Sequence, residues 1–90
     1  METLYLRRCE DFVWRDIGGE VVILNEEGTQ VCLLNKTASS IWTLCDGTKA
    51  LDEIAAQLCD RFDVSSAEAL ADVQEFADEL VGAGLVVWSA

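Results

Sequence analysis

Residues 34–47 read LNKTASSIWTLCDG. Asn35 suits the position just before a helix, because its short side chain can accept a hydrogen bond from a backbone N–H of the first turn. Apolar residues then recur at helical spacing, at Ala38, Ile41, Trp42 and Cys45. Asp46-Gly47 ends the pattern. The stretch therefore predicts a short amphipathic helix that begins after Asn35.

Three short β-prone runs precede this helix. Residues 12–17 end at Gly18-Gly19, residues 20–24 are followed by the turn sequence NEEG at 25–28, and residues 29–34 lead into the helix. Connections this short predict an antiparallel meander of three strands. The second and third runs carry apolar side chains on both faces, so we expect the N-terminal arm (residues 1–11), a second subunit or a bound partner to cover the second face.

Two further helices and a short tail follow the first helix. An apolar face at Leu51, Ile54, Ala55, Leu58 and Phe62 predicts the second helix, which is preceded by Ala50, a residue with no capping oxygen. Residues 65–68 read SSAE, a capping-box pattern, and open a third helix that ends near Gly82 and Gly84. The β-prone tail, residues 85–88, is expected to pair with the sheet or to pack beneath it. The predicted fold is one α+β domain over residues 1–90, a three-stranded antiparallel sheet followed by three helices, similar to a winged helix-turn-helix.

The charge of the chain disfavours nucleic acids and membranes as partners. Seventeen acidic residues face six basic ones among 90 residues, for a net charge of −11. Residues 65–83 contain five acidic side chains and no Lys or Arg, so this helix would be repelled by DNA phosphates, and a DNA-binding winged helix is the least favoured alternative. The sequence contains neither a signal peptide nor an apolar run of membrane-spanning length, which predicts a cytoplasmic protein.

The residue types needed for catalysis or metal binding are missing from the sequence. There is no His, the commonest general base and the usual activator of a Cys nucleophile. No Gly-rich phosphate-binding loop is present. The four cysteines, Cys9, Cys32, Cys45 and Cys59, are dispersed and form no C-x-x-C pair. We therefore predict no enzyme activity, no metal and no cofactor.

Peptide binding and self-association remain as functions. An exposed strand edge offers unpaired N–H and C=O groups to which an extended peptide can add as a further strand. The same apolar sheet surface would also serve a homodimeric interaction module, which is the main alternative.

The order and spacing of these residues resemble the PqqD-like family of peptide chaperones, also called RiPP recognition elements. Residues 34–47 resemble the family's block LN-x-T-x-x-x-IW-x-L-x-DG. The continuation is carried by residues 53–55, 58–62, 72–76, 80 and 84–86, so that the resemblance covers roughly residues 12–88. Ala50 departs from the family, which often has Thr or Ser there.

The resemblance implies that the leader segment of a ribosomally synthesised precursor peptide binds between the third strand and the third helix as an added antiparallel strand. The domain then presents the precursor to a separate modifying enzyme, often a radical-SAM protein, as in PQQ biosynthesis. Carried onto this chain, the strand is residues 29–34 and the helix is residues 66–83. The predicted peptide-binding residues are Thr29, Gln30, Val31, Cys32 and Leu33 of the strand, Leu70, Val73 and Ala77 lining the groove, and Asp72 and Glu75 reading basic residues of the leader.

Overall fold

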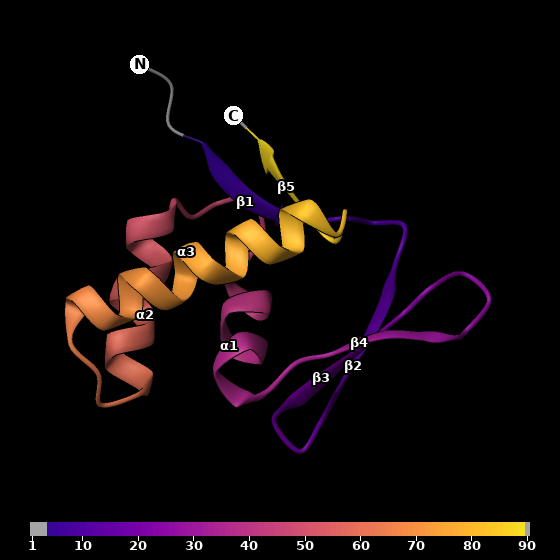
Figure 1. Cartoon of the computed structure of the whole chain (residues 1–90), viewed down its shortest axis with the longest axis horizontal. Coiled ribbons are helices and arrows are strands. Elements are labelled where there is room, and N and C mark those ends of the chain that lie inside the picture. Colours follow the sequence, from indigo (N-terminus) through magenta and orange to yellow (C-terminus); the bar gives the residue numbers. More distant parts are fainter. Residues whose placement is uncertain (1–3, 90) are drawn as a thin grey trace.

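The computed structural model describes residues 4–89, so residues 1–3 of the predicted N-terminal arm, and residue 90, lie outside the described part (Figure 1). The elements in chain order are β1 (Tyr5–Arg8), β2 (Val13–Ile17), β3 (Glu20–Leu24), β4 (Gln30–Leu33), α1 (Lys36–Leu44), α2 (Leu51–Arg61), α3 (Ser66–Gly82) and β5 (Val86–Ser89). The predicted α+β fold, a three-stranded antiparallel sheet followed by three helices, is confirmed.

Strands β2, β3 and β4 form the predicted meander, with β3 in the centre. Gly18 and Gly19 have φ angles of 64° and 91°, values that side chains oppose, and they make the two-residue turn between β2 and β3. The turn between β3 and β4 is held by Asn25, whose side-chain oxygen accepts from the backbone N–H of Glu27 at 3.0 Å and of Thr29 at 2.9 Å.

A second, two-stranded ribbon joins the two ends of the chain. β1 pairs antiparallel with β5, in the register Tyr5↔Ser89 to Arg8↔Val86, and Leu6 and Val86 of this ribbon are fully buried. The tail thus pairs with the N-terminal arm and not with the meander. In Figure 1 this ribbon lies at the top of the view, above α3, and the meander lies at the lower right.

The outer face of the meander is open, which corrects one of the three expectations for it. Val13, Ile17 and Leu33 are 56%, 63% and 58% exposed. Residues 5–8 of the arm do not cover this face, because they pair with β5. A second subunit and a bound partner remain as predicted covers.

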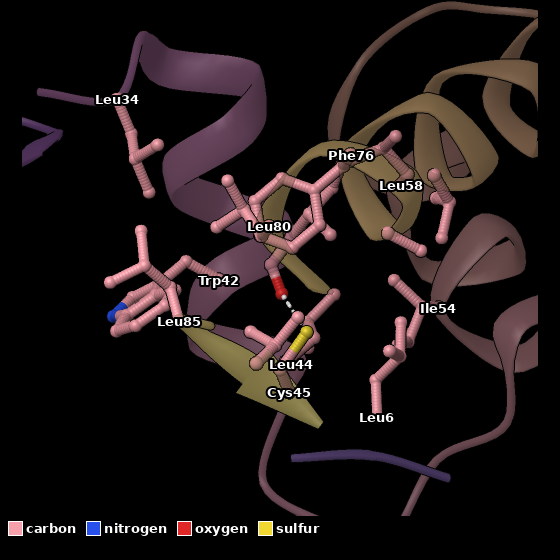
Figure 2. Packing of buried hydrophobic residues seen from close by; sticks show 14 of the residues in the cluster. Leu6, Leu34, Trp42, Leu44, Cys45, Ile54, Leu58, Phe76, Leu80 and Leu85 are labelled. Atoms are coloured by element: carbon pink, nitrogen blue, oxygen red, sulfur yellow. Dashed lines mark hydrogen bonds between the residues drawn. The ribbon is translucent and has the colours of Figure 1, made fainter. Parts of the chain in front are cut away.

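The three helices pack around one core, and side chains cap the first turns of α1 and α3. Asn35 Oδ1 accepts from the N–H of Ala38 at 2.8 Å, and Ser65 Oγ accepts from the N–H of Glu68 at 3.2 Å. Ala50 has no capping oxygen, but the carboxylate of Glu53 accepts from its N–H at 3.1 Å. Figure 2 shows side chains of all three helices meeting in the core, including Trp42 and Leu44 of α1, Ile54 and Leu58 of α2, and Phe76 and Leu80 of α3. None of the helices in residues 4–89 has the length and apolar character to cross a membrane.

Candidate functional site

One edge of the meander is open at β4, because this strand pairs only with β3. The backbone N–H of Leu34 donates to the carbonyl of Val21 at 2.9 Å, which makes these two residues a hydrogen-bonded pair. Hydrogen-bonded and non-bonded pairs alternate along an antiparallel ladder. The next pair, Val22 and Leu33, is therefore non-bonded, and the N–H and C=O of Leu33 point away from β3 toward the open edge.

Ser39 of α1 fixes the end of this ladder. Its hydroxyl accepts from the N–H of Val21 at 2.8 Å and donates to the carbonyl of Leu34 at 3.1 Å, taking the place of a direct strand-to-strand bond. Ser39 is only 4% exposed. Since buried polar groups are costly when unpaired, this bridge holds the first turns of α1 against the point where β4 ends.

A β-bulge interrupts the ladder nearer the start of β4. Ile23 pairs with Cys32, but Leu24 pairs with Gln30, so that Val31 is an extra residue on the edge strand. The N–H of Asn25 donates to the carbonyl of Thr29 at 3.0 Å, which identifies Asn25 and Thr29 as the next hydrogen-bonded pair. By the same alternation Gln30 directs its backbone groups outward. The open edge thus presents the backbone of Gln30 and Leu33, whereas that of Cys32 faces β3.

A groove of about 310 Å³ runs between the start of α1 and the middle of α3. Asn35, Thr37, Ala38 and Ile41 line one side, and Asp72, Glu75, Phe76 and Glu79 line the other. The four residues of α3 lie on one helix face because they are spaced by three, four and seven positions. The chain passes from β4 directly into α1, so the groove begins where the open edge ends.

The structure brings together only part of the predicted site. Gln30, Val31, Cys32 and Leu33 make up β4, and Thr29 lies in the turn just before it. Asp72 and Glu75 lie in the groove, as their predicted role requires.

The other three residues predicted on α3 lie elsewhere, and for these the prediction was wrong. Val73 and Ala77 are 0% and 1% exposed and pack in the core, so their side chains cannot line an accessible groove. Leu70 is exposed, but it lies at a separate hollow of about 180 Å³ with Ala55, Ala56 and Cys59 of α2.

Six groove residues were missing from the predicted site: Asn35, Thr37, Ala38, Ile41, Phe76 and Glu79. A signal for Glu79 was present in the sequence, because it lies seven positions after Asp72 and four after Glu75 and therefore shares their helix face. Phe76 lies four positions after Asp72 and therefore shares this face as well. It is 6% exposed, so it forms the apolar floor of the groove while belonging to the core.

The groove is lined by carboxylates, and the charge of one of them, Glu79, acts on β4. Burial raises the pKa of the Cys32 thiol, and the negative charge of Glu79 raises it further, so the carboxylate of α3 acts on the edge strand. In residues 4–89 the one ion pair joins Lys49 to Asp46 at 3.1 Å, away from the groove. Asp72, Glu75 and Glu79 thus form no ion pair within the described chain.

These features suit binding more than catalysis. The open edge supplies backbone donors and acceptors for an extended chain, and the groove supplies an apolar floor with carboxylates beside it. Among the described residues, no group of three or more His, Cys, Asp or Glu side chains is arranged to hold a metal ion.

Sequence and structure comparisons agree with this geometry. The family described as coenzyme PQQ synthesis protein D (PqqD) matches residues 20–86, which include β3 and β4 of the meander, the three helices and the first residue of β5. No curated protein matches the sequence.

Two solved structures share the fold. One is TbiB1 in complex with the TbiA(beta) leader peptide, with a TM-score of 0.78 and 27% sequence identity over 93% of this chain and 98% of that one. The other is the heterocyclase TruD, with a TM-score of 0.71 and 18% identity over 97% of this chain but only 12% of that one. The second likeness establishes the fold alone.

Proposed function

The chain belongs to the PqqD family, and from this premise we propose that it binds the leader segment of a ribosomally synthesised precursor peptide as a strand added to β4. The observation that carries the proposal is the open edge of β4 at Gln30 and Leu33, next to the groove of α1 and α3. TbiB1, which shares the fold over nearly its whole length, was solved with a leader peptide bound. The family and this neighbour support a binding role without catalysis.

The bound leader lies antiparallel to β4 in this proposal and pairs with the backbone of Gln30 and Leu33. The side chains of the leader that point toward α3 enter the groove at Asp72, Glu75, Phe76 and Glu79. Thr29, Val31 and Cys32 contribute through the shape of the strand and not through outward backbone bonds. The chain then presents the precursor to a modifying enzyme in the cytoplasm, and the family resemblance favours a radical-SAM protein.

A selection from random peptides tests the binding site and does not require the cognate precursor. Random 12-residue peptides are displayed and selected on the chain, and the affinities of the recovered peptides are measured by fluorescence polarisation. Leu33→Pro removes the outward N–H, a change that an edge strand tolerates when the N–H faces away from its neighbour. Leu33→Thr is the matched control, because it changes the exposed side chain and keeps the N–H.

We expect Leu33→Pro to weaken binding of the recovered peptides at least about tenfold. A loss of this size corresponds to one hydrogen bond together with less favourable packing of the peptide against β4. Leu33→Thr should bind within about twofold of the original chain. Circular dichroism should show unchanged helix content in both variants. Peptides that bind the Pro variant as tightly as the original chain would rule out strand addition at this edge.

Self-association is a second candidate, and the open outer face of the meander favours it. Val13, Ile17 and Leu33 expose more than half of their surface there, and exposed apolar patches often mark contact surfaces. A homodimer formed through this face predicts a mass of twice 9.9 kDa in sedimentation at micromolar concentration. Replacing Ile17 by Lys should then return the chain to a monomer. A monomer at all concentrations excludes this candidate.

A further inference from the structure

The wall of the groove on α3 carries three carboxylates in a row along the helix. Asp72, Glu75 and Glu79 lie three and four positions apart, so each is a neighbour of the next on the same face. Asp72 is half-buried, and Glu75 and Glu79 are exposed. Like charges at this spacing repel each other and weaken a helix. The three carboxylates therefore gain from a cation placed between them.

None of these three carboxylates forms an ion pair within residues 4–89, and four of the six basic side chains have contacts elsewhere. Arg8 donates to the carbonyls of Trp42 and Thr43 at 2.8 and 3.1 Å. Arg7 lies beside Gly47, and Lys36 lies beside Gly19 at the turn between β2 and β3. Lys49 pairs with Asp46. The 17 residues of α3 include no Lys or Arg.

The spacing of the carboxylates fits alternate residues of a strand. A helix rises about 1.5 Å per residue, so Asp72 and Glu79 lie about 10 Å apart along its axis. Alternate residues of a strand face the same side about 6.6 Å apart. Two neighbouring groove-facing side chains of an added strand therefore fit within the row of carboxylates. Phe76, between Glu75 and Glu79, offers its ring to the aliphatic stems of long basic side chains.

An acidic row alone would not specify a ligand, but the open strand edge next to it does. The outward backbone of Gln30 and Leu33 requires an extended peptide, and the alternation of a strand decides which of its side chains face α3. The effect of Glu79 on Cys32 places the acidic wall within electrostatic reach of that strand.

We propose that the peptide bound by this chain is cationic on one side, with Lys or Arg at two positions separated by one residue (B-x-B), both directed at Asp72, Glu75 and Glu79. This inference rests on the proposed function and names the chemistry of the ligand at that site. The residue between the two basic ones points away from α3 and is free of this requirement. Charge complementarity across the groove then selects the peptide, while the backbone of β4 holds it.

The same displayed library of random 12-residue peptides tests this inference through the sequences that it returns. Peptides whose binding is lost with Leu33→Pro are grouped and their residues are counted. We expect enrichment of Lys and Arg in the B-x-B pattern. The variant Asp72→Asn, Glu75→Gln, Glu79→Gln should bind these peptides about tenfold more weakly, because two exposed ion pairs are lost. It should also show a weaker dependence of affinity on salt.

A second triple variant separates the local effect from the loss of net charge. Asp52→Asn, Asp60→Asn, Asp63→Asn removes the same number of negative charges from exposed residues outside the groove. It should bind B-x-B peptides within about threefold of the original chain. An equal loss of affinity in both triple variants would overturn the specific role of the groove.

The selected peptides show separately whether the ligand is cationic and whether it binds by strand addition. Peptides that depend on Leu33 but carry no excess of basic residues contradict the cationic ligand and leave strand addition intact. Recovery of no peptide that depends on Leu33 contradicts the proposed function itself, and the inference falls with it.

Discussion

The hydroxyl of Ser39 joins the backbone N–H of Val21, at 2.8 Å, to the carbonyl of Leu34, at 3.1 Å. One side chain of α1 thus ties the central strand of the meander to the end of its edge strand. The groove begins at this point, so the bridge fixes how the open edge and the helices are placed relative to each other. Asn35 lies one helical turn before Ser39 and caps the same end of α1.

Replacing Ser39 by Ala should destabilise the fold. The N–H of Val21 and the carbonyl of Leu34 would both lose their partner in a buried place, and we expect the free energy of unfolding to fall by about 1–3 kcal/mol. Urea denaturation measures this change. Ser40→Ala is the matched control, because no hydrogen bond of the Ser40 side chain is present in residues 4–89, and it should cost less than about 0.5 kcal/mol. Equal losses in both variants would show that the bridge contributes nothing specific.

The thiol of Cys45 should be unreactive in the folded protein. Burial raises its pKa to about 12, and the thiol donates to the carbonyl of Ile41 at 3.2 Å (Figure 2). Because the thiolate is the reactive form, iodoacetamide at pH 8 should leave Cys45 unmodified in the native chain and modify it fully in urea. Mass spectrometry of the peptide that contains residue 45 gives the extent of modification. Rapid native modification would mean that this part of the core opens readily.

Asp46 should make stability depend on pH in the acidic range. The hydroxyl of Thr48 donates to its carboxylate, and Lys49 adds an ion pair, so that its pKa falls from 3.8 to about 2. A carboxyl whose pKa is lowered by folding stabilises the protein above the unfolded pKa, and this contribution is lost as the pH falls through the folded pKa.

Between pH 5 and pH 2, the original chain should therefore lose more stability than Asp46→Asn does. The difference should be no more than about 1 kcal/mol, because the side chain is 39% exposed and solvent screens its charge. Urea denaturation at several pH values gives both curves. Parallel curves for the two chains would contradict this role of Asp46.

Local signals in the sequence were enough to predict most of the meander and the helices. The strands end at the glycine pair 18–19 and at the NEEG turn, residues 25–28. Both turns form from local properties, namely the positive φ angles of the glycines and the hydrogen bonds of the Asn25 side chain, so they can be read from the sequence. Asn35 and Ser65 cap their helices as predicted. The predicted strand 29–34 and helix 66–83 each exceed the observed elements, Gln30–Leu33 and Ser66–Gly82, by one or two residues.

Features that depend on distant parts of the chain were not predictable in this way. The pairing of β1 with β5 joins residues more than 75 positions apart, and no local period encodes such a partner. The bulge at Val31 follows from the hydrogen-bond register between two strands. For α3, the apolar stripe identifies what is buried. Val73 and Ala77, assigned to the groove from the family resemblance, belong to these buried residues, and the groove uses the polar face beside them.

Amide hydrogen exchange at Leu33 tests strand addition most directly, measured with and without a saturating peptide from the selection. In the free chain the N–H of Leu33 faces the open edge and should exchange fast, whereas that of Cys32 faces β3 and should be protected. With peptide bound, exchange at Leu33 should slow by about a hundredfold or more, because its N–H enters a new ladder. Unchanged exchange at both Leu33 and Gln30 under saturating peptide would contradict the account.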